Sequence, residues 1–488
     1  MKRCNRWMAA GMALMLAVPL YGCGGPGEKG VADEVITLRI LENDTAKEKG
    51  YLDELIKAFN EAYADKGIQA VDANMDEYSN LAENGPYGYG PDVLYQANDK
   101  LMTYAEDKHL FAVTPEDFEC YDKTAERAWK AFELSADGKV YTCGIPVNVQ
   151  EPMLFYREDL MPDDWQSAWD DDQNGVADFF ENWNDLYAYS SQLRNSDGSP
   201  NKDSQYGYMS SLNNLYLNAN FLFSYGAYVF GESEQGGLDT ADIGFASGSA
   251  DKGIQALMQF AGLMNEGCID DTIISNRYEK LAAGEYFCTV STPDTYTVFV
   301  DKLKLHYEND GMSGEEAQKK AEENVKMIEL PAKMPADGDL SKDSGTMAES
   351  DWVKTVVMGG INGYGISAYT KHKDACIEFV DFATSYDMIT RRAGMLGIAP
   401  TRSDAAAATG GTADVIFQSL EDKRIELMPS VKAVDQIWTP VQTLLGDFAK
   451  DAFRSDAEKK YTDADSVISA LENADQNIYN AIYTLADK

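Results

Sequence analysis

Strand-like and helix-like patterns alternate along the first part of the chain, and this alternation constrains the fold more than any other feature. Residues 35–41 (VITLRIL) are rich in β-branched side chains and predict a strand. Apolar residues then recur at helical spacing over residues 52–63. Residues 91–95 and 140–147 predict two further strands. Strands that alternate with amphipathic helices predict an α/β fold built on a largely parallel sheet.

The length of the chain and its later segments predict more than one lobe. The 488 residues are about three times the usual domain size, so we expect at least two lobes. Helical spacing returns over residues 254–264 and 375–385, and the chain is rich in helix-forming residues from Ser419 onward. Hydrophobic residues make up 44% of the chain, which is enough for a globular core.

The first residues predict an exported protein. Lys2, Arg3 and Arg6 precede a mostly apolar run, residues 7–20, that is too short to span a bilayer comfortably. Leu20-Tyr21-Gly22-Cys23 follows and resembles the lipobox of bacterial lipoproteins, which implies that Cys23 is lipidated and becomes the first mature residue. A simple secretory signal is the alternative. We therefore expect a signal peptide at residues 1–22 and a flexible tether at residues 23–34, with the protein held on the extracytoplasmic face of the cell membrane.

The net charge excludes several classes of partner. The chain has 81 Asp and Glu against 42 Lys and Arg, a formal net charge of -39. Nucleic-acid binding needs clustered basic residues, so a nucleic-acid partner is excluded. Docking on anionic lipid through a basic patch is excluded for the same reason, and we expect membrane contact only through the lipid anchor.

Cysteine and histidine usage argues against a catalytic or zinc site. Beyond Cys4 and Cys23, five cysteines remain without a CxxC pair, and we expect most of them to be buried core residues. A bridge between Cys120 and Cys143 is conceivable. The chain has three histidines, so we expect neither a His-based catalytic dyad nor a His-based metal cluster. It has neither a Walker-type phosphate loop nor a GxGxxG after a strand, so we expect no nucleotide cofactor.

One segment matches a calcium-binding loop. Residues 170–181 (DDDQNGVADFFE) follow the twelve-residue pattern of EF-hand-type loops. Gly175 permits the sharp turn that such loops need. Calcium takes six to eight hard oxygen ligands, so this spacing predicts a structural Ca2+ site. Its ligands would be the side chains or carbonyl oxygens of Asp170, Asp172, Asn174, Val176, Asp178 and Glu181. The alternative is an acidic turn in an already acidic protein.

A series of short motifs, each weak alone, occurs in a consistent order. The first is Gly90-Pro91-Asp92 with its following strand and loop, as far as Lys100. The later ones are Ile145-Pro146 with Leu154-Phe155-Tyr156-Arg157, Tyr216 with Gly226-Ala227-Tyr228, Ala283-Gly284-Glu285 with Ser291-Thr292-Pro293, residues 360–367, and Met428-Pro429 with Trp438. Together they resemble extracellular solute-binding proteins, closest to the maltose and maltodextrin receptors of ABC importers, over nearly all the mature chain.

The resemblance implies a fold and a function. It implies a two-lobed periplasmic-binding-protein-like fold of the class II type, with hinge strands between the lobes and a ligand cleft. The implied boundaries are residues 35–149 plus 333–385 for lobe 1 and residues 150–332 plus 386–488 for lobe 2. The implied protein is a monomer without catalytic activity. It closes over a small-molecule sugar, an oligosaccharide by this resemblance, and delivers it to ABC permease subunits in the membrane.

Position by position, the resemblance also implies a set of ligand-binding residues. Gln96 and Asp294 stand where the maltodextrin receptors have stacking tryptophans, whereas Trp438 retains a third. The implied set is Asn43, Asp44, Gln96, Asp99, Lys100, Gln150, Glu151, Asn214, Tyr216, Asp294, Tyr296, Trp438 and Gln442.

Three other functions remain open from the sequence alone. The same fold could bind a non-sugar solute such as a peptide, an amine or a phosphate ester. A surface glycoside hydrolase would need two carboxylates flanking the bond, and 81 acidic residues always provide a pair. A structural or adhesion lipoprotein would use the calcium loop for rigidity.

Overall fold

The computed structural model describes residues 35–136, 138–193, 206–233 and 237–484. The chain divides into residues 1–35 and one compact unit of residues 36–488. The predicted signal peptide, the tether and Cys23 lie outside the described residues. In the part of the chain that is described, no helix has the length and apolar character needed to cross a membrane.

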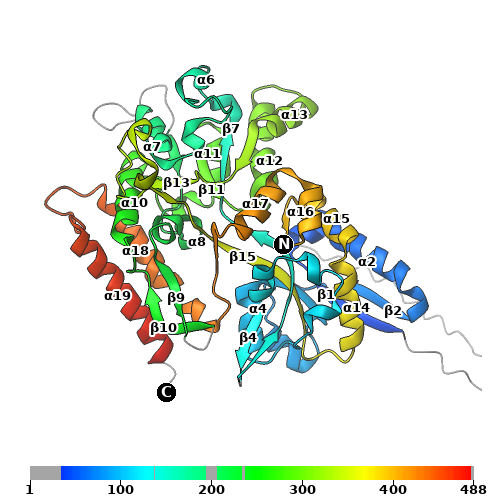
Figure 1. Ribbon diagram of the computed structural model, residues 1–488. Helices are drawn as coiled ribbons and strands as arrows, with labels where there is room; N and C mark the ends of the chain where they lie inside the picture. Colours follow the sequence, from blue (N-terminus) through cyan, green and yellow to red (C-terminus); the bar gives the residue numbers. More distant parts are fainter. Residues whose placement is uncertain (1–34, 137, 194–205, 234–236, 485–488) are drawn as a thin grey trace, which may run out of the picture. The chain divides into compact units, whose positions relative to one another are not determined.

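Seven strands form the larger sheet, in the order β16-β6-β15-β3-β1-β2 with β17 beside β15 (Figure 1). The strands are β1 (Ile36–Leu41), β2 (Ile68–Asp72), β3 (Val93–Ala97), β6 (Ile145–Gln150), β15 (Val357–Ile366), β16 (Ala399–Pro400) and β17 (Ile425–Leu427). β1 is parallel to β2 and β3, whereas β15 is antiparallel to β3 and β6. The sheet is therefore mixed rather than largely parallel, because β15 lies between β3 and β6 and runs opposite to both.

Four strands form the smaller sheet, in the order β12-β7-β11-β8. They are β7 (Met153–Arg157), β8 (Tyr206–Met209), β11 (Tyr286–Ser291) and β12 (Val325–Ile328). Three strand pairs stand apart from both sheets: β4 (Glu133–Ala136) with β5 (Lys139–Thr142), β9 (Tyr228–Glu232) with β10 (Leu238–Gly244), and β13 (Lys333–Pro335) with β14 (Trp352–Lys354). We call each sheet with its packed helices a lobe: the seven-strand lobe and the four-strand lobe.

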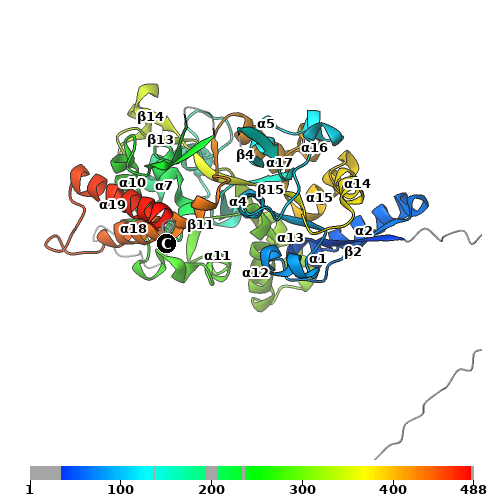
Figure 2. The same ribbon diagram turned by 90° about the horizontal axis from the view of Figure 1, so that it is seen from below.

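The helices divide between the two lobes (Figures 1 and 2). Those of the seven-strand lobe are α1 (Asp44–Glu48), α2 (Tyr51–Ala62), α3 (Leu81–Asn84), α4 (Asn98–Glu106), α5 (Glu126–Lys130), α14 (Lys373–Ala383), α15 (Tyr386–Leu396), α16 (Ser403–Thr409) and α17 (Gly411–Glu421). Those of the four-strand lobe are α6 (Trp165–Ala168), α7 (Trp183–Gln192), α8 (Leu215–Asn218), α9 (Asn220–Phe223), α10 (Ala250–Leu263), α11 (Arg277–Ala282), α12 (Tyr296–Asn309), α13 (Gly314–Asn324), α18 (Trp438–Asp451) and α19 (Ala464–Tyr483).

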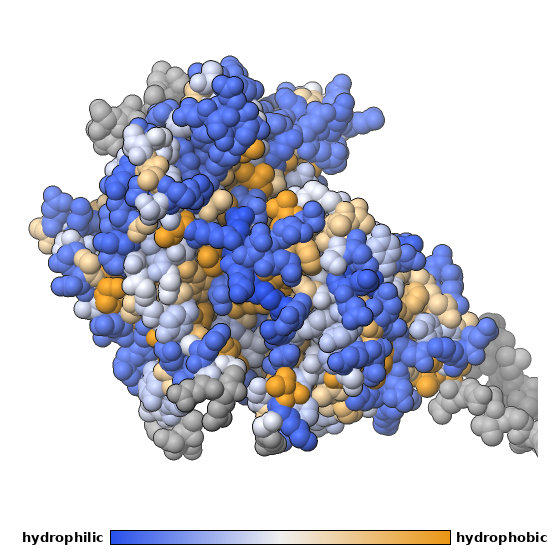
Figure 3. All heavy atoms as spheres, in the orientation of Figure 1, coloured by the Kyte–Doolittle hydropathy of each residue, from blue (hydrophilic) through white to orange (hydrophobic). Residues whose placement is uncertain are grey.

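The amphipathic pattern of α2 explains how its lobe is covered. Leu52, Leu55 and Phe59 lie on one face of the helix and are at most 1% exposed. They pack with Phe379 of α14 and with Ile40 of β1 in a single apolar cluster. Burial of each large side chain contributes about 1.5–3 kcal/mol relative to exposure. The opposite, polar face of such helices forms the surface, which is largely hydrophilic on the side seen in Figure 3.

The strand pairing differs from the expected lobe boundaries. The resemblance implies that residues 386–488 belong as a whole to the second lobe, but β16 pairs with β6 and β17 pairs with β15, so residues 386–427 return to the larger sheet. The reason is the apolar face of α15, which packs against α2. Residues 333–354 were assigned to the first lobe, but β13 packs on α7, and the Trp183 indole donates to the Pro331 carbonyl at 3.1 Å.

The segment around Gly144 and the buried cysteines bear on two further predictions. The strand expected over residues 140–147 is two strands, β5 and β6, which belong to different sheets and are separated by residues 143–144. At Gly144 the ring of Phe132 leaves no room for a side chain. The five cysteines Cys120, Cys143, Cys268, Cys288 and Cys376 are all buried and unpaired, which confirms the prediction that most of them are core residues.

Candidate functional site

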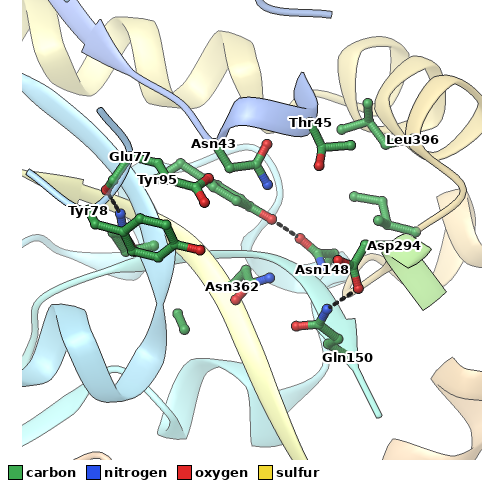
Figure 4. A pocket seen from close by; sticks show the side chains of 13 residues that line it. Asn43, Thr45, Glu77, Tyr78, Tyr95, Asn148, Gln150, Asp294, Asn362 and Leu396 are labelled. Atoms are coloured by element: carbon green, nitrogen blue, oxygen red, sulfur yellow. Dashed lines mark hydrogen bonds between the residues drawn. The ribbon is translucent and has the colours of Figure 1, made fainter. Parts of the chain in front are cut away.

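A cavity of about 210 Å³ lies where β3, β6 and β15 approach the start of α12 (Figure 4). We call it the central cavity. Its walls come from α1, from the loop before α3, from the end of α15, and from the 3₁₀ turn Pro293–Thr295 of the four-strand lobe. Its lining residues are Asn43, Thr45, Glu77, Tyr78, Tyr95, Gln96, Ala97, Asn148, Gln150, Asp294, Asn362, Leu396 and Ile398.

Amide side chains form much of the floor of the central cavity. Asn148 and Gln150 are two residues apart on β6 and so point to the same face of the sheet. Asn362 of β15 lies directly opposite Asn148 in the strand register. The hydroxyl of Tyr95, on β3, donates to Oδ1 of Asn148. Three neighbouring strands thus present hydrogen-bonding groups to one space (Figure 4).

Gln150 joins the two lobes. Its Nε2 donates to Oδ1 of Asp294 at 3.0 Å, and its backbone carbonyl accepts from the Tyr216 hydroxyl at 3.1 Å. Gln150 ends β6, whereas Asp294 and Tyr216 belong to the four-strand lobe. A group that binds Gln150 and Asp294 together would therefore hold both lobes.

A buried ion pair between Arg392 and Glu42 packs against the residues that form the floor of the central cavity. Arg392, 1% exposed, donates from its two terminal nitrogens to Glu42, at 2.6 and 3.0 Å. The guanidinium lies 4.1 Å from the ring centre of Tyr95 and 4.8 Å from that of Tyr51, which gives it cation–π contacts on both. The hydroxyl of Tyr364 donates to Glu42 as well. This cluster fixes the ring of Tyr95, and through it Asn148.

The charged groups around the crossing between lobes are strongly desolvated. Glu151 is 4% exposed, and its Oε1 has no hydrogen-bond partner. Burial raises the pKa of the Glu151 carboxyl well above its ordinary value, and Glu329 adds to the rise while Arg424 opposes it. Burial likewise raises the pKa of Asp99. A carboxyl in such surroundings favours its neutral form.

The lining suits a neutral ligand rich in hydroxyl groups. Amides both donate and accept, carboxylates accept, and tyrosine rings offer flat apolar faces. Glu77 and Asp294 are the acidic residues among the described lining residues, and none of those residues is Lys, Arg or His. A phosphate ester would therefore meet no compensating charge in the central cavity.

The sequence-predicted ligand residues fall into several places. Asn43, Gln96, Gln150 and Asp294 line the central cavity. Tyr296 lies beside it, in a neighbouring cavity that also includes Asp294. Those that line neither cavity are Asp44, Asp99, Lys100, Glu151, Asn214, Tyr216, Trp438 and Gln442.

The residues outside the cavities have visible structural roles. Asn214 caps α8 by accepting from the Leu217 amide, at 3.1 Å. Lys100 is exposed and lies over the ring of Tyr104. Trp438 begins α18 and packs on the large apolar core. Gln442 lines a separate groove between α18 and α19. Their roles in ligand binding stay predictions.

Sequence reasoning missed six polar lining residues: Thr45, Glu77, Tyr78, Tyr95, Asn148 and Asn362. Asn148 had a usable signal, because it stands two residues before Gln150 on the same predicted strand. Asn362 lies within residues 360–367, a glycine-rich segment that is one of the motifs carrying the resemblance. Glu77 and Tyr78 lie in an irregular loop, where no periodicity indicates direction.

The calcium-type loop is exposed and folded on itself. Gly175 has φ +83°, the left-handed conformation that the loop pattern demands. The Asp170 carboxylate accepts from the Gly175 amide, and Asn174 donates to Glu181 at 2.6 Å. Within the described residues, no group of three or more His, Cys, Asp or Glu side chains is arranged to hold a metal ion. Calcium binding stays a prediction.

Comparison with known proteins gives a family match over most of the chain. The model of the family described as bacterial extracellular solute-binding protein matches residues 54–419. The galactooligosaccharide-binding protein of Bacillus subtilis (strain 168) is 23% identical over 455 residues, covering 91% of each chain. The maltooligosaccharide ABC transporter solute-binding lipoprotein of Streptococcus pneumoniae serotype 4 is 22% identical over 465 residues, covering 94% of this chain and 95% of that one.

Solved structures share the arrangement of the two lobes. The maltose-binding periplasmic protein MalE of Listeria monocytogenes, in complex with maltose, superposes with a TM-score of 0.67 at 17% identity. The superposition covers 92% of this chain and 98% of that one. This similarity confirms the predicted two-lobed α/β fold.

Proposed function

The chain belongs to the bacterial extracellular solute-binding protein family, and we propose that its solute is an oligosaccharide, bound in the central cavity between the two lobes. The observation that carries the proposal is the lining of that cavity, where amides, carboxylates and tyrosine rings converge without a basic residue. Similarity to proteins named for galactooligosaccharide and maltooligosaccharide binding supports the same ligand class.

The protein acts as a receptor and not as an enzyme, because its family is one of solute-binding proteins. The ligand is held between Gln150 of the seven-strand lobe and Asp294 of the four-strand lobe, so binding favours the closed arrangement of the lobes. The glycoside hydrolase alternative lacks support for a second reason. The two acidic lining residues, Glu77 and Asp294, come with an array of neutral amides that suits binding rather than bond cleavage.

The partner that receives the sugar is the permease of an ABC importer. Support comes from the Streptococcus pneumoniae relative, whose name describes an ABC transporter lipoprotein. The basic start and the Leu20–Cys23 motif support a lipid anchor at Cys23, which keeps the receptor at the extracytoplasmic face of the membrane beside its permease. The receptor acts as a monomer.

The test is a thermal-shift screen of residues 24–488 against maltooligosaccharides, galactooligosaccharides and a non-sugar panel of peptides and amines. A sugar present at about a hundred times its Kd adds about 2.7 kcal/mol of stability, which appears as a clear rise in Tm. A rise with sugars alone supports the proposal. A rise with peptides or amines, and none with any sugar, rejects the carbohydrate assignment.

We propose further that residues 170–181 bind one Ca2+ ion, which has a structural role. Support comes from the full register of oxygen-bearing residues at the liganding positions and from the left-handed backbone at Gly175. Asp170, Asp172, Asn174, Asp178 and Glu181 would supply side-chain oxygens. Val176 would supply its backbone carbonyl oxygen.

A further inference from the structure

The described chain crosses between the two lobes at three places: between β6 and β7, between β14 and β15, and between β17 and α18. Glu151 belongs to the first crossing. Glu329 follows β12, and its segment is bonded to the second crossing, where the Thr355 amide donates to the Ala332 carbonyl at 2.8 Å. Arg424 directly precedes β17, which leads to the third crossing. These three charged residues therefore lie at the hinge, where the lobes turn relative to each other.

An ion pair at the hinge joins the two lobes. The Nη1 of Arg424 donates to Oε2 of Glu329 at 2.9 Å, and the Ser419 hydroxyl donates to Oε1 of the same carboxylate. Glu329 follows a strand of the four-strand lobe, whereas Ser419 and Arg424 belong to the α17–β17 segment of the seven-strand lobe. Both charged side chains are partly buried, so salt screens the pair less than it screens a surface pair. Rotation of one lobe against the other changes the distance within this pair.

Glu151 and Arg424 each keep one hydrogen-bonding group unused. Glu151 is almost fully buried, and its Oε1 has no partner among the described residues. The Nε of Arg424 is likewise buried without a partner in the part of the chain that is described. Burial raises the pKa of Glu151, the charge of Glu329 raises it further, and the charge of Arg424 lowers it, so both neighbours act on this carboxyl. Buried polar groups are normally paired, so the two unused groups indicate a second arrangement of partners.

We propose that Arg424 is a switch residue at the hinge, paired with Glu329 when the lobes hold sugar and with Glu151 when the lobes rotate apart. Glu151 can serve as the second partner because it lies in a crossing, where rotation of the lobes moves atoms least. None of the three is among the described lining residues of the central cavity, so Arg424 is a positioning residue and not a ligand contact. The inference rests on the proposed oligosaccharide function and adds how the affinity of that site is set.

The switch changes sugar affinity through the population of the lobe arrangement that binds. In the described arrangement Gln150 donates to Asp294 across the lobes. The bond between Arg424 and Glu329 belongs to the same arrangement, so it raises the fraction of protein that is ready to bind. The measured Kd equals the intrinsic Kd divided by that fraction. A substitution that favours the Glu151 partner should therefore weaken sugar binding without any change in the cavity lining.

The test is a double-mutant cycle on the mature chain, residues 24–488. Glu329→Gln removes the charge of the first partner, Glu151→Gln removes that of the second, and a third variant carries both changes. Calorimetry measures the Kd for maltotriose and for a galactooligosaccharide of three units. Glu158→Gln is the matched control, because Glu158 pairs with Lys326 of β12 at 3.0 Å within the four-strand lobe. Circular dichroism and Tm establish that each variant folds.

We expect Glu329→Gln to raise the Kd by about tenfold, which is typical of coupling between distant sites. In the Glu151→Gln background the same substitution should raise the Kd by less than about threefold, because the second partner no longer carries a charge. Ser419→Ala removes one bond to Glu329 without changing a charge, and it should raise the Kd by a smaller factor than Glu329→Gln does. Glu158→Gln should bind sugar as the wild type does.

Small-angle X-ray scattering without sugar measures the switch directly. Glu329→Gln should have a larger radius of gyration than the wild type, because more molecules have their lobes rotated apart. The double variant should return toward the wild-type radius. A contact with a merely structural role would lower Tm and leave this radius unchanged.

Two results overturn the inference. Equal losses of affinity from Glu329→Gln in the two backgrounds would show that Glu329 and Glu151 do not compete for Arg424. An equal radius of gyration in the wild type, Glu329→Gln and the double variant would show that the ion pair does not set the arrangement of the lobes. A wild type that binds neither sugar rejects the proposed function instead, and the scattering of the sugar-free variants then decides on the switch alone.

Discussion

Arg392 has a role that its neighbour Arg391 does not share. Arg392 is 1% exposed and paired with the fully buried Glu42, whereas Arg391 forms a surface pair with Glu54. Replacing Arg392 leaves the Glu42 charge buried without a partner. We expect Arg392→Ala to lower the free energy of unfolding by about 3–5 kcal/mol, measured by urea denaturation.

Arg391→Ala is the matched control for this substitution, one residue away on the same helix. Exposed ion pairs contribute about 0–1 kcal/mol, so its unfolding midpoint should stay close to that of the wild type. Equal losses of stability in the two variants would contradict the assignment of a structural role to the Arg392 pair.

The pKa of Glu151 predicts a pH dependence of stability. Its pKa is raised above the ordinary value of 4.5, so the folded state holds this proton more tightly than the unfolded chain does. The stabilisation is fully present below that ordinary value and is lost as pH rises through the elevated pKa. The groups that face it are Glu329, Arg424 and Tyr216.

We expect Glu151→Gln to remove that loss, because the amide stays neutral at every pH. Urea unfolding at a series of pH values should show the variant gaining stability relative to the wild type as pH rises. Glu158→Gln is the control, since Glu158 is exposed and pairs with Lys326. A constant difference between Glu151→Gln and the wild type across pH would rule out a neutral Glu151.

The sequence predicts whether a side chain is buried only where a periodic pattern shows which face of a helix or strand it lies on. Arg392 shares the spacing of Ile389, Ala393 and Leu396, so its place on the buried face of α15 was readable from periodicity. Its partner Glu42 was not, because it follows the end of β1 and meets Arg392 only through the fold. Asn43, Gln96, Gln150 and Asp294 were placed at the cavity by resemblance rather than by any local signal.

At the scale of elements, regular patterns predicted the presence of helices and strands well and their first and last residues less well. The helix predicted over residues 52–63 is α2 (Tyr51–Ala62), and the one predicted over residues 375–385 is α14 (Lys373–Ala383). The short strands β16 and β17 gave no usable signal. They have two and three residues, and only their pairing with β6 and β15 defines them.

The loop at residues 170–181 makes an element-scale prediction about metal removal. If it binds Ca2+, adding excess chelator should lower Tm, and returning calcium should restore it. Saturation at about a hundred times Kd corresponds to about 2.7 kcal/mol. Differential scanning calorimetry with and without chelator measures this difference.

A pair of adjacent substitutions makes the calcium test specific. Asp172 stands at a liganding position of the pattern, whereas Asp171 does not. Asp172→Ala should abolish the calcium-dependent rise in Tm, and Asp171→Ala should keep it. The same calcium response in both variants, or none in the wild type, would reject the site.

At the scale of the whole molecule, Gln150 predicts how ligand binding depends on the contact between lobes. Removing its amide removes one hydrogen-bonding group for ligand and its bond to Asp294. A neutral hydrogen bond contributes about 0.5–1.5 kcal/mol, so Gln150→Ala should weaken sugar binding by about two- to tenfold at every ligand length. Isothermal titration calorimetry measures the change.

Gln442→Ala distinguishes the ligand position implied by the structure from the one implied by the resemblance. Gln442 was expected to contact ligand, but it lines the groove beside α18. We therefore expect its affinity for sugars to equal that of the wild type. If Gln442→Ala lowered the affinity for sugars and Gln150→Ala left it unchanged, the ligand would lie where the resemblance implies and not in the central cavity.

The lobe boundaries show what sequence could not supply at this scale. Two lobes followed from length, and their α/β class followed from alternation and resemblance. Which segment returns to which sheet depends on pairing between strands far apart in sequence, such as β6 with β16. Such pairing leaves no periodic trace in either segment.

The position of β15 has a consequence for how the chain can be made. This strand lies between β3 and β6 in the larger sheet, yet it follows β6 by about two hundred residues. Until residues 357–366 emerge from the ribosome, β3 and β6 have no partner between them, and loop closure over so long a span is slow. The first lobe to begin synthesis is therefore the last to complete its sheet, and a nascent chain cut short of β15 exposes two unpaired strand edges.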